Sequence, residues 1–150
     1  MIYIYTDGGC SNNPKSKHHK YGAWAFVVIK DDDLIHFDHG DAHNVTSNIM
    51  ELTAITKGLQ WLRDNNITDK VIVLSDSKYC ITGLNLWLKQ WIDQKWYSTS
   101  GKPIANQQLW QYLNSLKLSL PNVTFKWVRG HAGNQWNEMV DQLCWDARGK

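Results

Sequence analysis

The sequence predicts an α/β fold in which helices flank a five-stranded mixed sheet. Apolar runs of strand length alternate with stretches whose apolar residues recur at helical spacing, in the order β-β-β-α-β-α-α-β-α. The polar segment 7–21 and the turn signal at 31–33 separate the first three runs without a helical pattern, whereas helices separate the later ones. We therefore expect three antiparallel strands followed by parallel strands.

The three antiparallel strands are expected at residues 2–6, 22–29 and 34–39. The second of them, Gly22-Ala23-Trp24-Ala25-Phe26-Val27-Val28-Ile29, is an apolar run of strand length. The turn signal Asp31-Asp32-Asp33 separates it from the third strand. The opening of the chain is thus expected to be an antiparallel meander.

Residues 45–63 are predicted to form a helix with Thr46 or Ser47 as its N-cap. Its apolar residues recur at helical spacing and form one stripe, which consists of Leu52, Ile55, Leu59 and Leu62.

The rest of the chain is predicted from the same signals. Pro121 and Asn122 end one of its helices before the last strand. The expected elements are a strand at 71–74, a helix at 77–96 in two pieces near Gly83, a loop at 97–103, a helix at 104–118, a strand at 123–128 and a helix at 134–147.

Composition limits the classes to which the chain can belong. Its 150 residues suit one domain, 1–150, with a sizeable core, and its net charge of +2 leaves the question of a nucleic-acid partner open. Three unpaired-looking cysteines, Cys10, Cys80 and Cys144, argue against a disulfide framework. The sequence contains no leader pattern and no apolar run of ~20 residues. We expect a cytoplasmic monomer with no membrane partner.

Four acidic residues occur in distinctive contexts: Asp7, Glu51, Asp76 and Asp141. Asp7 and Asp76 each follow an apolar run, Glu51 lies in the first turns of a predicted helix, and Asp141 lies within the last one. Ligand sites of open α/β sheets lie beyond the carboxyl ends of strands. Carboxylates gathered there would repel one another unless a cation intervened, and Mg²⁺ prefers such oxygen ligands. These residues therefore suggest metal-dependent phosphoryl transfer.

Each acidic residue taken alone has a simpler explanation. Asp7-Gly8 could form a turn, and Asp76 could be the N-cap of the helix that begins at Ser77. All four in their contexts favour a shared site.

A set of short motifs follows in order along nearly the whole chain: Thr6-Asp7-Gly8, Asn13-Pro14, Tyr21-Gly22-Ala23, Thr46-Ser47-Asn48, Met50-Glu51-Leu52, Ser75-Asp76-Ser77, Val128 to Gly133, Asn137-Glu138 and Asp141. In this joint order and spacing the chain resembles a family, type 1 ribonuclease H. The resemblance implies a ribonuclease H-like fold and endonucleolytic cleavage of the RNA strand of an RNA–DNA hybrid. It also implies two Mg²⁺ ions, with Mn²⁺ as a substitute, and products with 3′-hydroxyl and 5′-phosphate ends.

The resemblance also implies roles for individual residues. Asp7, Glu51, Asp76 and Asp141 would bind the metal ions, and two such ions can stabilise both the attacking and the leaving oxygen. His131, on the loop between Gly130 and Gly133, would assist proton transfer or product release, which its near-neutral pKa class permits.

Two sets of substrate contacts are implied. One set would probe the 2′-hydroxyls of the RNA strand through side-chain amides and hydroxyls. It consists of Asn13, Ser47 and Asn48. The other would hold the DNA strand and its phosphates, with Thr46 favoured by its place near a helix N-terminus. It consists of Thr46 and Asn106, with Trp96 flanking the DNA strand. Lys78 is a separate candidate for a contact to a phosphate or sugar near Asp76. Asn13 could instead be a turn residue, and Asn106 a helix cap.

Two segments depart from the family pattern. Lys15–Lys20 is longer and more basic than the usual loop, and it could bind phosphates or only be solvated. Residues 85–96, where the family carries a basic handle, have a net charge of only +1 from Lys89, Lys95 and Asp93. We therefore expect modest, salt-sensitive binding.

Three alternatives stay open. The chain could be a non-catalytic hybrid-binding module, although no carboxylate is missing. It could be an integrase- or resolvase-like enzyme acting on DNA, or a domain of a reverse transcriptase.

Overall fold

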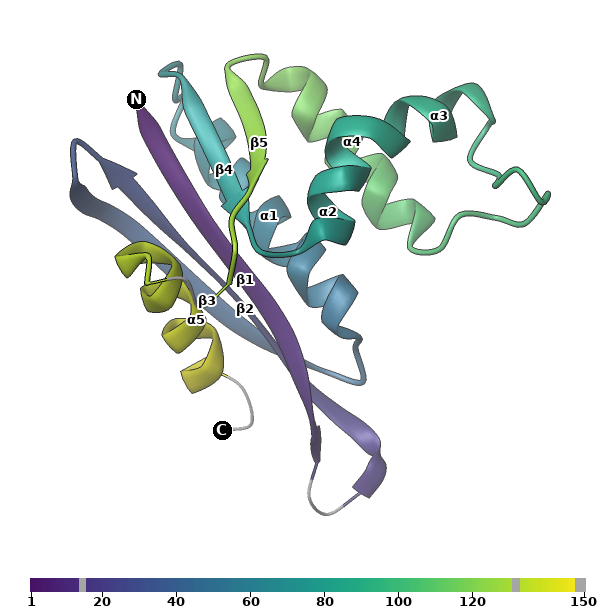
Figure 1. The fold of residues 1–150 in the computed structure, drawn as a ribbon, viewed down its shortest axis with the longest axis horizontal. Coiled ribbons are helices and arrows are strands. Elements are labelled where there is room, and N and C mark those ends of the chain that lie inside the picture. Colours follow the sequence, from purple (N-terminus) through teal and green to yellow (C-terminus); the bar gives the residue numbers. More distant parts are fainter. Residues whose placement is uncertain (14–15, 131–132, 148–150) are drawn as a thin grey trace.

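The computed structural model describes residues 1–13, 16–130 and 133–147, with only the backbone described for residues 12, 13 and 16–20. Its centre is a five-stranded sheet with the strand order β3-β2-β1-β4-β5 (Figure 1). The first three strands pair antiparallel, and β4 and β5 run parallel to β1. The predicted mixed α/β sheet is therefore confirmed.

The strands are bounded as follows: β1 Ile2–Asn13, β2 Ser16–Lys30, β3 Asp33–His43, β4 Val71–Ser75 and β5 Val123–Trp127. The helical segments are α1 Ser47–Asp64, α2 Lys78–Thr82, the π-helical segment η1 Gly83–Trp87, α3 Leu88–Asp93, α4 Gln107–Ser119 and α5 Gln135–Ala147.

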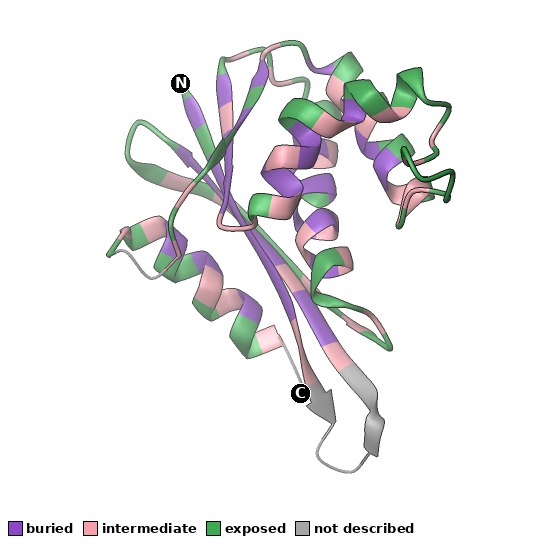
Figure 2. Cartoon of the chain, turned by 45° about the vertical axis from the view of Figure 1, so that its right-hand side comes forward, coloured by how far each residue is buried: buried purple, intermediate pink, exposed green. Residues whose placement is uncertain are grey.

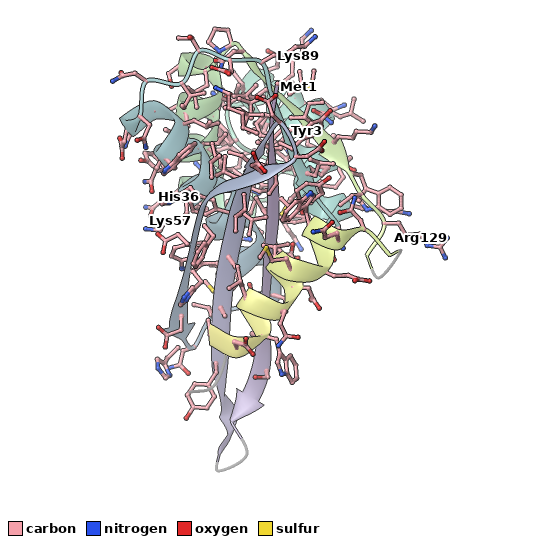
Figure 3. The ribbon with its side chains drawn as sticks, turned by 90° about the vertical axis from the view of Figure 1, so that its left-hand side faces the viewer. Met1, Tyr3, His36, Lys57, Lys89 and Arg129 are labelled. Atoms are coloured by element: carbon pink, nitrogen blue, oxygen red, sulfur yellow. The ribbon has the colours of Figure 1, made fainter. Side chains whose placement is uncertain are left out.

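The helices form two layers of unequal size. The helices α1 to α4 and η1 lie on one side of the sheet, where α3 extends outward beyond the strands, and α5 covers part of the other face (Figure 1). Figure 3 shows α5 lying across the strands, with Arg129 pointing away from the sheet beyond β5. Buried residues run through the sheet and along the inward sides of the helices (Figure 2). Among the described helices, none is both long and apolar enough to cross a membrane.

The sheet separates two apolar cores because successive side chains of a strand point to opposite faces. Ile2 and Ile4 of β1 belong to the larger core under α1 and α4, while Tyr5 belongs to the smaller core under α5. The expected stripe of α1 lies in the larger core, where Leu52, Ile55, Leu59 and Leu62 are fully buried.

The first two strands are longer than expected. The expected end of the first strand at residue 6 is wrong, because β1 pairs with β2 as far as Asn13. Residues 16–20, expected to lie in a loop, belong to β2. Residues 7–13 lack strand-like apolar alternation, and their extended backbone is held by hydrogen bonding to the partner strand. Position 15 lies outside the described residues.

The helix expected at 77–96 ends earlier. It runs on through α2, η1 and α3 and ends at Asp93, so Trp96 lies beyond it with a positive φ of 70°. The expected change near Gly83 is present as the start of the π-helical segment. A side chain at Gly83 would collide with the indole of Trp110, which packs against this turn. The helix expected from residue 104 begins at Gln107.

Candidate active site and metal centre

Asp7 occupies the point on β1 where pairing with β4 stops. The last parallel pair is Thr6 with Ser75, and the Thr6 hydroxyl donates a hydrogen bond to the carbonyl of Leu74 at 3.1 Å. Asp7 is therefore inside β1 but just past the carboxyl end of β4. Only 7% of Asp7 is exposed. This is the position beyond a strand end at which α/β folds build their sites.

Gly8 brings β1 against the first turns of α1. A Cβ atom at Gly8 would overlap the backbone of Met50 and Glu51. The absence of a side chain therefore lets the two main chains touch, which places Glu51 beside Asp7. The Oε2 atom of Glu51 is buried in this contact region.

Asp76 lies between the end of β4 and the start of α2. The N-cap of α2 is Ser77, whose hydroxyl accepts a hydrogen bond from the backbone N–H of Cys80 at 3.2 Å. The backbone N–H of Ser77 donates to the hydroxyl of Ser75 at 3.1 Å. The alternative in which Asp76 caps this helix is therefore wrong, and its carboxylate is available to the site.

The structure brings three of the four acidic residues into one group. One carboxylate oxygen each of Asp7, Glu51 and Asp76 lies within 4.8 Å of the other two. Asp141, on α5, contacts Asp7, and their side chains share a hydrogen bond. Four segments from β1, α1, β4 and α5 thus converge on one point.

This crowding raises the pKa of Asp7 from 3.8 to about 8. Burial is the largest cause, followed by the hydrogen bond to Asp141 and the negative charges of Asp76 and Asp141. The backbone N–H of Gly8 opposes the shift by donating to Asp7. A carboxyl that keeps its proton at neutral pH beside other carboxylates marks a place where a cation can take the proton's place. The oxygen-only donor set fits a hard divalent cation.

Comparison with known proteins identifies the family. The sequence model described as RNase H matches residues 1–148. The chain belongs to the ribonuclease H family. It is 41% identical over 143 residues to a ribonuclease H of Ruthia magnifica subsp. Calyptogena magnifica, covering 95% of this chain and 92% of that protein. It is 36% identical over 144 residues to a ribonuclease H of Thiobacillus denitrificans, with coverage of 96% and 90%.

Solved structures show the same fold. The solution structure of the PFV RNase H domain superposes with a TM-score of 0.86 at 19% identity and covers 97% of this chain and 93% of that one. The crystal structure of LC11-RNase H1 in complex with an RNA/DNA hybrid has a TM-score of 0.70 at 20% identity, with coverage of 98% and 99%.

The predicted family, fold and enzyme class are therefore confirmed. As a ribonuclease H, the chain is a nuclease that cleaves the RNA strand of RNA–DNA hybrids. Metal dependence comes with the family, and the acidic group provides a place for the metal.

Two of the residues predicted to read the RNA strand, Ser47 and Asn48, lie at the start of α1, next to Thr46, which is predicted to hold a phosphate of the DNA strand. Thr46 is the N-cap of α1, and the Thr46 hydroxyl accepts a hydrogen bond from the backbone N–H of Ile49 at 3.2 Å. The expectation that Thr46 or Ser47 caps this helix is confirmed. Ser47 is exposed, and its hydroxyl lies 3.3 Å from the sulfur of Cys10. Asn48 is exposed beside it.

The predicted DNA-strand residue Asn106 lies at the N-terminal end of α4 in a left-handed conformation, with φ 59°. Its side-chain amide donates to the hydroxyl of Tyr79 at 3.4 Å, not to the helix backbone, so Asn106 does not cap α4 through its side chain. A cavity of about 620 Å³ is lined by this helix end and by α1: Ile49, Asn106, Gln107, Gln108 and Leu109.

Lys78 and Trp96 lie in different settings. Lys78 is exposed on α2, next to Asp76, with its amino group 4.9 Å from the ring centroid of Trp127. Trp96 is half-buried against the larger core, and its backbone N–H donates to the carbonyl of Trp91 at 2.7 Å. His131 and the side chain of Asn13 lie outside the described residues.

Two residues that contact this region were absent from the predictions. Trp127 donates a hydrogen bond to the carbonyl of Asp76, and Tyr79 joins Asn106 to Trp110. Both lie in elements that the periodicity predicts, but no local pattern indicates which long-range partner they reach.

Proposed function

We propose that Asp7, Glu51, Asp76 and Asp141 hold two divalent cations, Mg²⁺ with Mn²⁺ as a substitute, at which the RNA strand is hydrolysed to 3′-hydroxyl and 5′-phosphate ends. The observation that carries this proposal is the three carboxylate oxygens within 4.8 Å of one another, together with the raised pKa of Asp7. When bound, such cations supply Lewis-acid stabilisation of the attacking and leaving oxygens in an in-line displacement.

Asp7 and His131 have separate roles in the proposed reaction. Asp7 is central because it contacts Asp141 on one side and belongs to the Asp7–Glu51–Asp76 group on the other. Its burial keeps water away from the centre of the site, which strengthens every charge interaction there. His131 would move a proton or assist product release, as its residue type allows near neutral pH.

Substrate binding is supported by where the exposed polar residues lie. Thr46, Ser47 and Asn48 start α1, the same helix that carries Glu51 one turn later. Amides and hydroxyls at the start of this helix suit the 2′-hydroxyls of the RNA strand, and Asn13 is proposed for the same role. The cavity at Asn106 suits a phosphate of the DNA strand. The first turn of α4 lines this cavity, and the N–H groups at a helix N-terminus attract anions.

The remaining substrate contacts lie on α2 and beyond α3. Lys78 is exposed two residues after Asp76 and carries a positive charge suited to a phosphate or sugar. Trp96 would flank the DNA strand. Both are proposed as substrate contacts.

We also propose that residues 1–150 act as one catalytic domain, as a monomer in the cytoplasm. No disulfide joins the three cysteines, which suits a reducing compartment. Light scattering of the purified chain tests the monomer.

The decisive experiment is cleavage of an end-labelled RNA–DNA hybrid with Mg²⁺, beside duplex DNA and duplex RNA. The Asp76→Asn and Asp141→Asn variants should not cleave. The matched control is Asp146→Asn, which removes an exposed carboxylate from the same helix as Asp141 and should cleave normally. Loss of cleavage in EDTA and recovery with Mg²⁺ or Mn²⁺ completes the expected result.

Each other outcome identifies an alternative. Hybrid binding without cleavage would indicate a binding module. Cleavage of duplex DNA would indicate an integrase- or resolvase-like enzyme. Full activity of Asp76→Asn would overturn the metal assignment.

A further inference from the structure

The indole of Trp127 lies directly behind the proposed metal ligand Asp76. Trp127 is the last residue of β5, paired in parallel register with Ser75, the last residue of β4. Its ring N–H donates a hydrogen bond to the backbone carbonyl of Asp76 at 3.1 Å. The next residue, Val128, donates its backbone N–H to the carbonyl of Ser75 at 2.9 Å. Two successive carbonyls of the turn that carries Asp76 are therefore held from the end of β5.

The ring of Trp127 also contacts the residue on the other side of the turn. The amino group of Lys78 lies 4.9 Å from the ring centroid of Trp127, a distance at which a cation is attracted to the aromatic face. Lys78 is exposed, so this contact limits where an otherwise mobile side chain can reach. One side chain thus touches both Asp76 and Lys78.

The exposure of Trp127 is unusual for a residue that only packs. Phe125 and Val123, two and four residues earlier on the same face of β5, are buried in the larger core. Trp127 continues their row but is 40% exposed, because it lies past the end of that core. The hydrogen bond to Asp76 and the contact with Lys78 therefore fix the orientation of the Trp127 side chain.

Asp76 lies in a short turn between β4 and α2. Ser77 already begins the cap of α2, so Asp76 is the single residue between β4 and that cap. On its far side a Cβ atom at Gly130 would lie 2.9 Å from Oδ2 of Asp76, so that the carboxylate passes close to the β5–α5 loop. A rotation of this peptide would move the carboxylate away from Asp7 and Glu51.

We propose that Trp127 is a positioning residue: its indole N–H holds the Asp76 carboxylate in the metal site, and its ring holds Lys78 toward the substrate. This inference rests on the proposed role of Asp76 as a metal ligand. Groups that orient metal ligands from behind commonly change metal affinity when they are removed.

The test measures metal binding without nucleic acid, followed by steady-state kinetics on the hybrid. Binding of Mn²⁺ is followed by the EPR signal of the free ion. Trp127→Phe keeps an aromatic face but removes the N–H donor, and it should weaken Mn²⁺ binding by about 3- to 10-fold, the usual effect of one lost hydrogen bond. Its KM for the hybrid should change by less than about 2-fold, since Lys78 keeps a ring to contact.

Two further variants separate the two roles. Trp127→Leu removes both the donor and the ring, and it should weaken Mn²⁺ binding and raise KM by about 3-fold or more. Lys78→Met should raise KM and leave Mn²⁺ binding unchanged. The matched control is Trp61→Phe, a half-buried tryptophan stacked on His36 at the other edge of the sheet, which should change neither quantity.

These experiments distinguish a wrong role for Trp127 from a wrong metal site. If Asp76→Asn abolishes Mn²⁺ binding while Trp127→Phe binds like the native chain, the positioning role is wrong and the metal site stands. If Asp76→Asn leaves Mn²⁺ binding intact, the metal assignment itself is wrong. A purely structural role for Trp127 would lower the temperature of unfolding without changing Mn²⁺ affinity, and that result also overturns the inference.

Discussion

The side chains of Asp7 and Asp141 share a hydrogen bond. Asp7 comes from the central strand β1, and Asp141 from α5, the last helix of the chain. The contact joins the two ends of the sequence at the candidate metal centre. A proton between the two carboxylates and a bound cation would each reduce the repulsion between their negative charges, so a cation can replace the proton.

The first prediction concerns pH. Since the folded chain raises the pKa of Asp7 from 3.8 to about 8, the folded state holds a proton that the unfolded state releases first. The stability of the cation-free protein contributed by this proton is complete below pH ~4 and is lost as pH rises toward about 8. Asp7→Asn should remove this dependence and stabilise the protein at pH 8 by at least about 1.4 kcal/mol, the equivalent of one pKa unit.

Thermal unfolding in EDTA from pH 5 to pH 9 measures this effect. Asp146→Asn, on an exposed carboxylate, should follow the native curve. Added Mg²⁺ should stabilise the native protein more at pH 8 than at pH 5, since protons compete with the cation. Equal slopes for the native protein and Asp7→Asn would contradict the prediction.

The second prediction uses Gly130. A methyl group there would lie 2.9 Å from Oδ2 of Asp76, so Gly130→Ala should displace that carboxylate and lower kcat by roughly 10- to 100-fold. Gly130 does not have a positive φ, so little backbone strain should accompany the loss. Gly101→Ala is the opposite control: its φ of 84° predicts strain of about 1 kcal/mol, with no neighbour within 4 Å to displace. The kcat and the unfolding temperature of both variants test this prediction. A Gly130→Ala variant with native kcat would contradict it.

The third prediction concerns Tyr79. Its hydroxyl accepts hydrogen bonds from the fully buried indole of Trp110 at 3.0 Å and from Asn106 at 3.4 Å. Tyr79→Phe should lower the free energy of unfolding by about 1–3 kcal/mol, because the Trp110 N–H loses its partner. Tyr112→Phe, at an exposed hydroxyl that accepts from Gln60, should change it by less than about 0.5 kcal/mol. Urea unfolding would refute the role of Tyr79 if the two variants behaved alike.

The fourth prediction concerns the start of α1. Thr46→Val removes the hydroxyl that caps the helix and should cost about 1 kcal/mol in urea unfolding, whereas Thr46→Ser keeps the cap. If Thr46 also contacts a phosphate, the KM for the hybrid should rise in Thr46→Val and stay near native in Thr46→Ser. An unchanged KM in both would confine Thr46 to its structural role.

The elements of the fold followed from local patterns where those patterns are strong. The helix expected at 45–63 is observed at Ser47–Asp64, because its apolar stripe is a property of neighbouring turns. The early end of the first expected strand was wrong because the outer part of β1 is held by pairing with β2, not by its own composition. Pairing between distant segments leaves little trace in either segment alone.

The sequence by itself determined the order of the elements, the mixed sheet, the family and the four acidic residues, since each rests on residue types at fixed spacing. Only the tertiary structure decided that Asp7, Glu51 and Asp76 form one group with Asp141 beside Asp7. It also decided that Ser77, and not Asp76, is the N-cap of α2. Trp127 behind Asp76 was likewise invisible before the fold, because parallel register between β4 and β5 sets that contact. Local periodicity selects which elements form, while burial and charge at their meeting point depend on how separate elements pack.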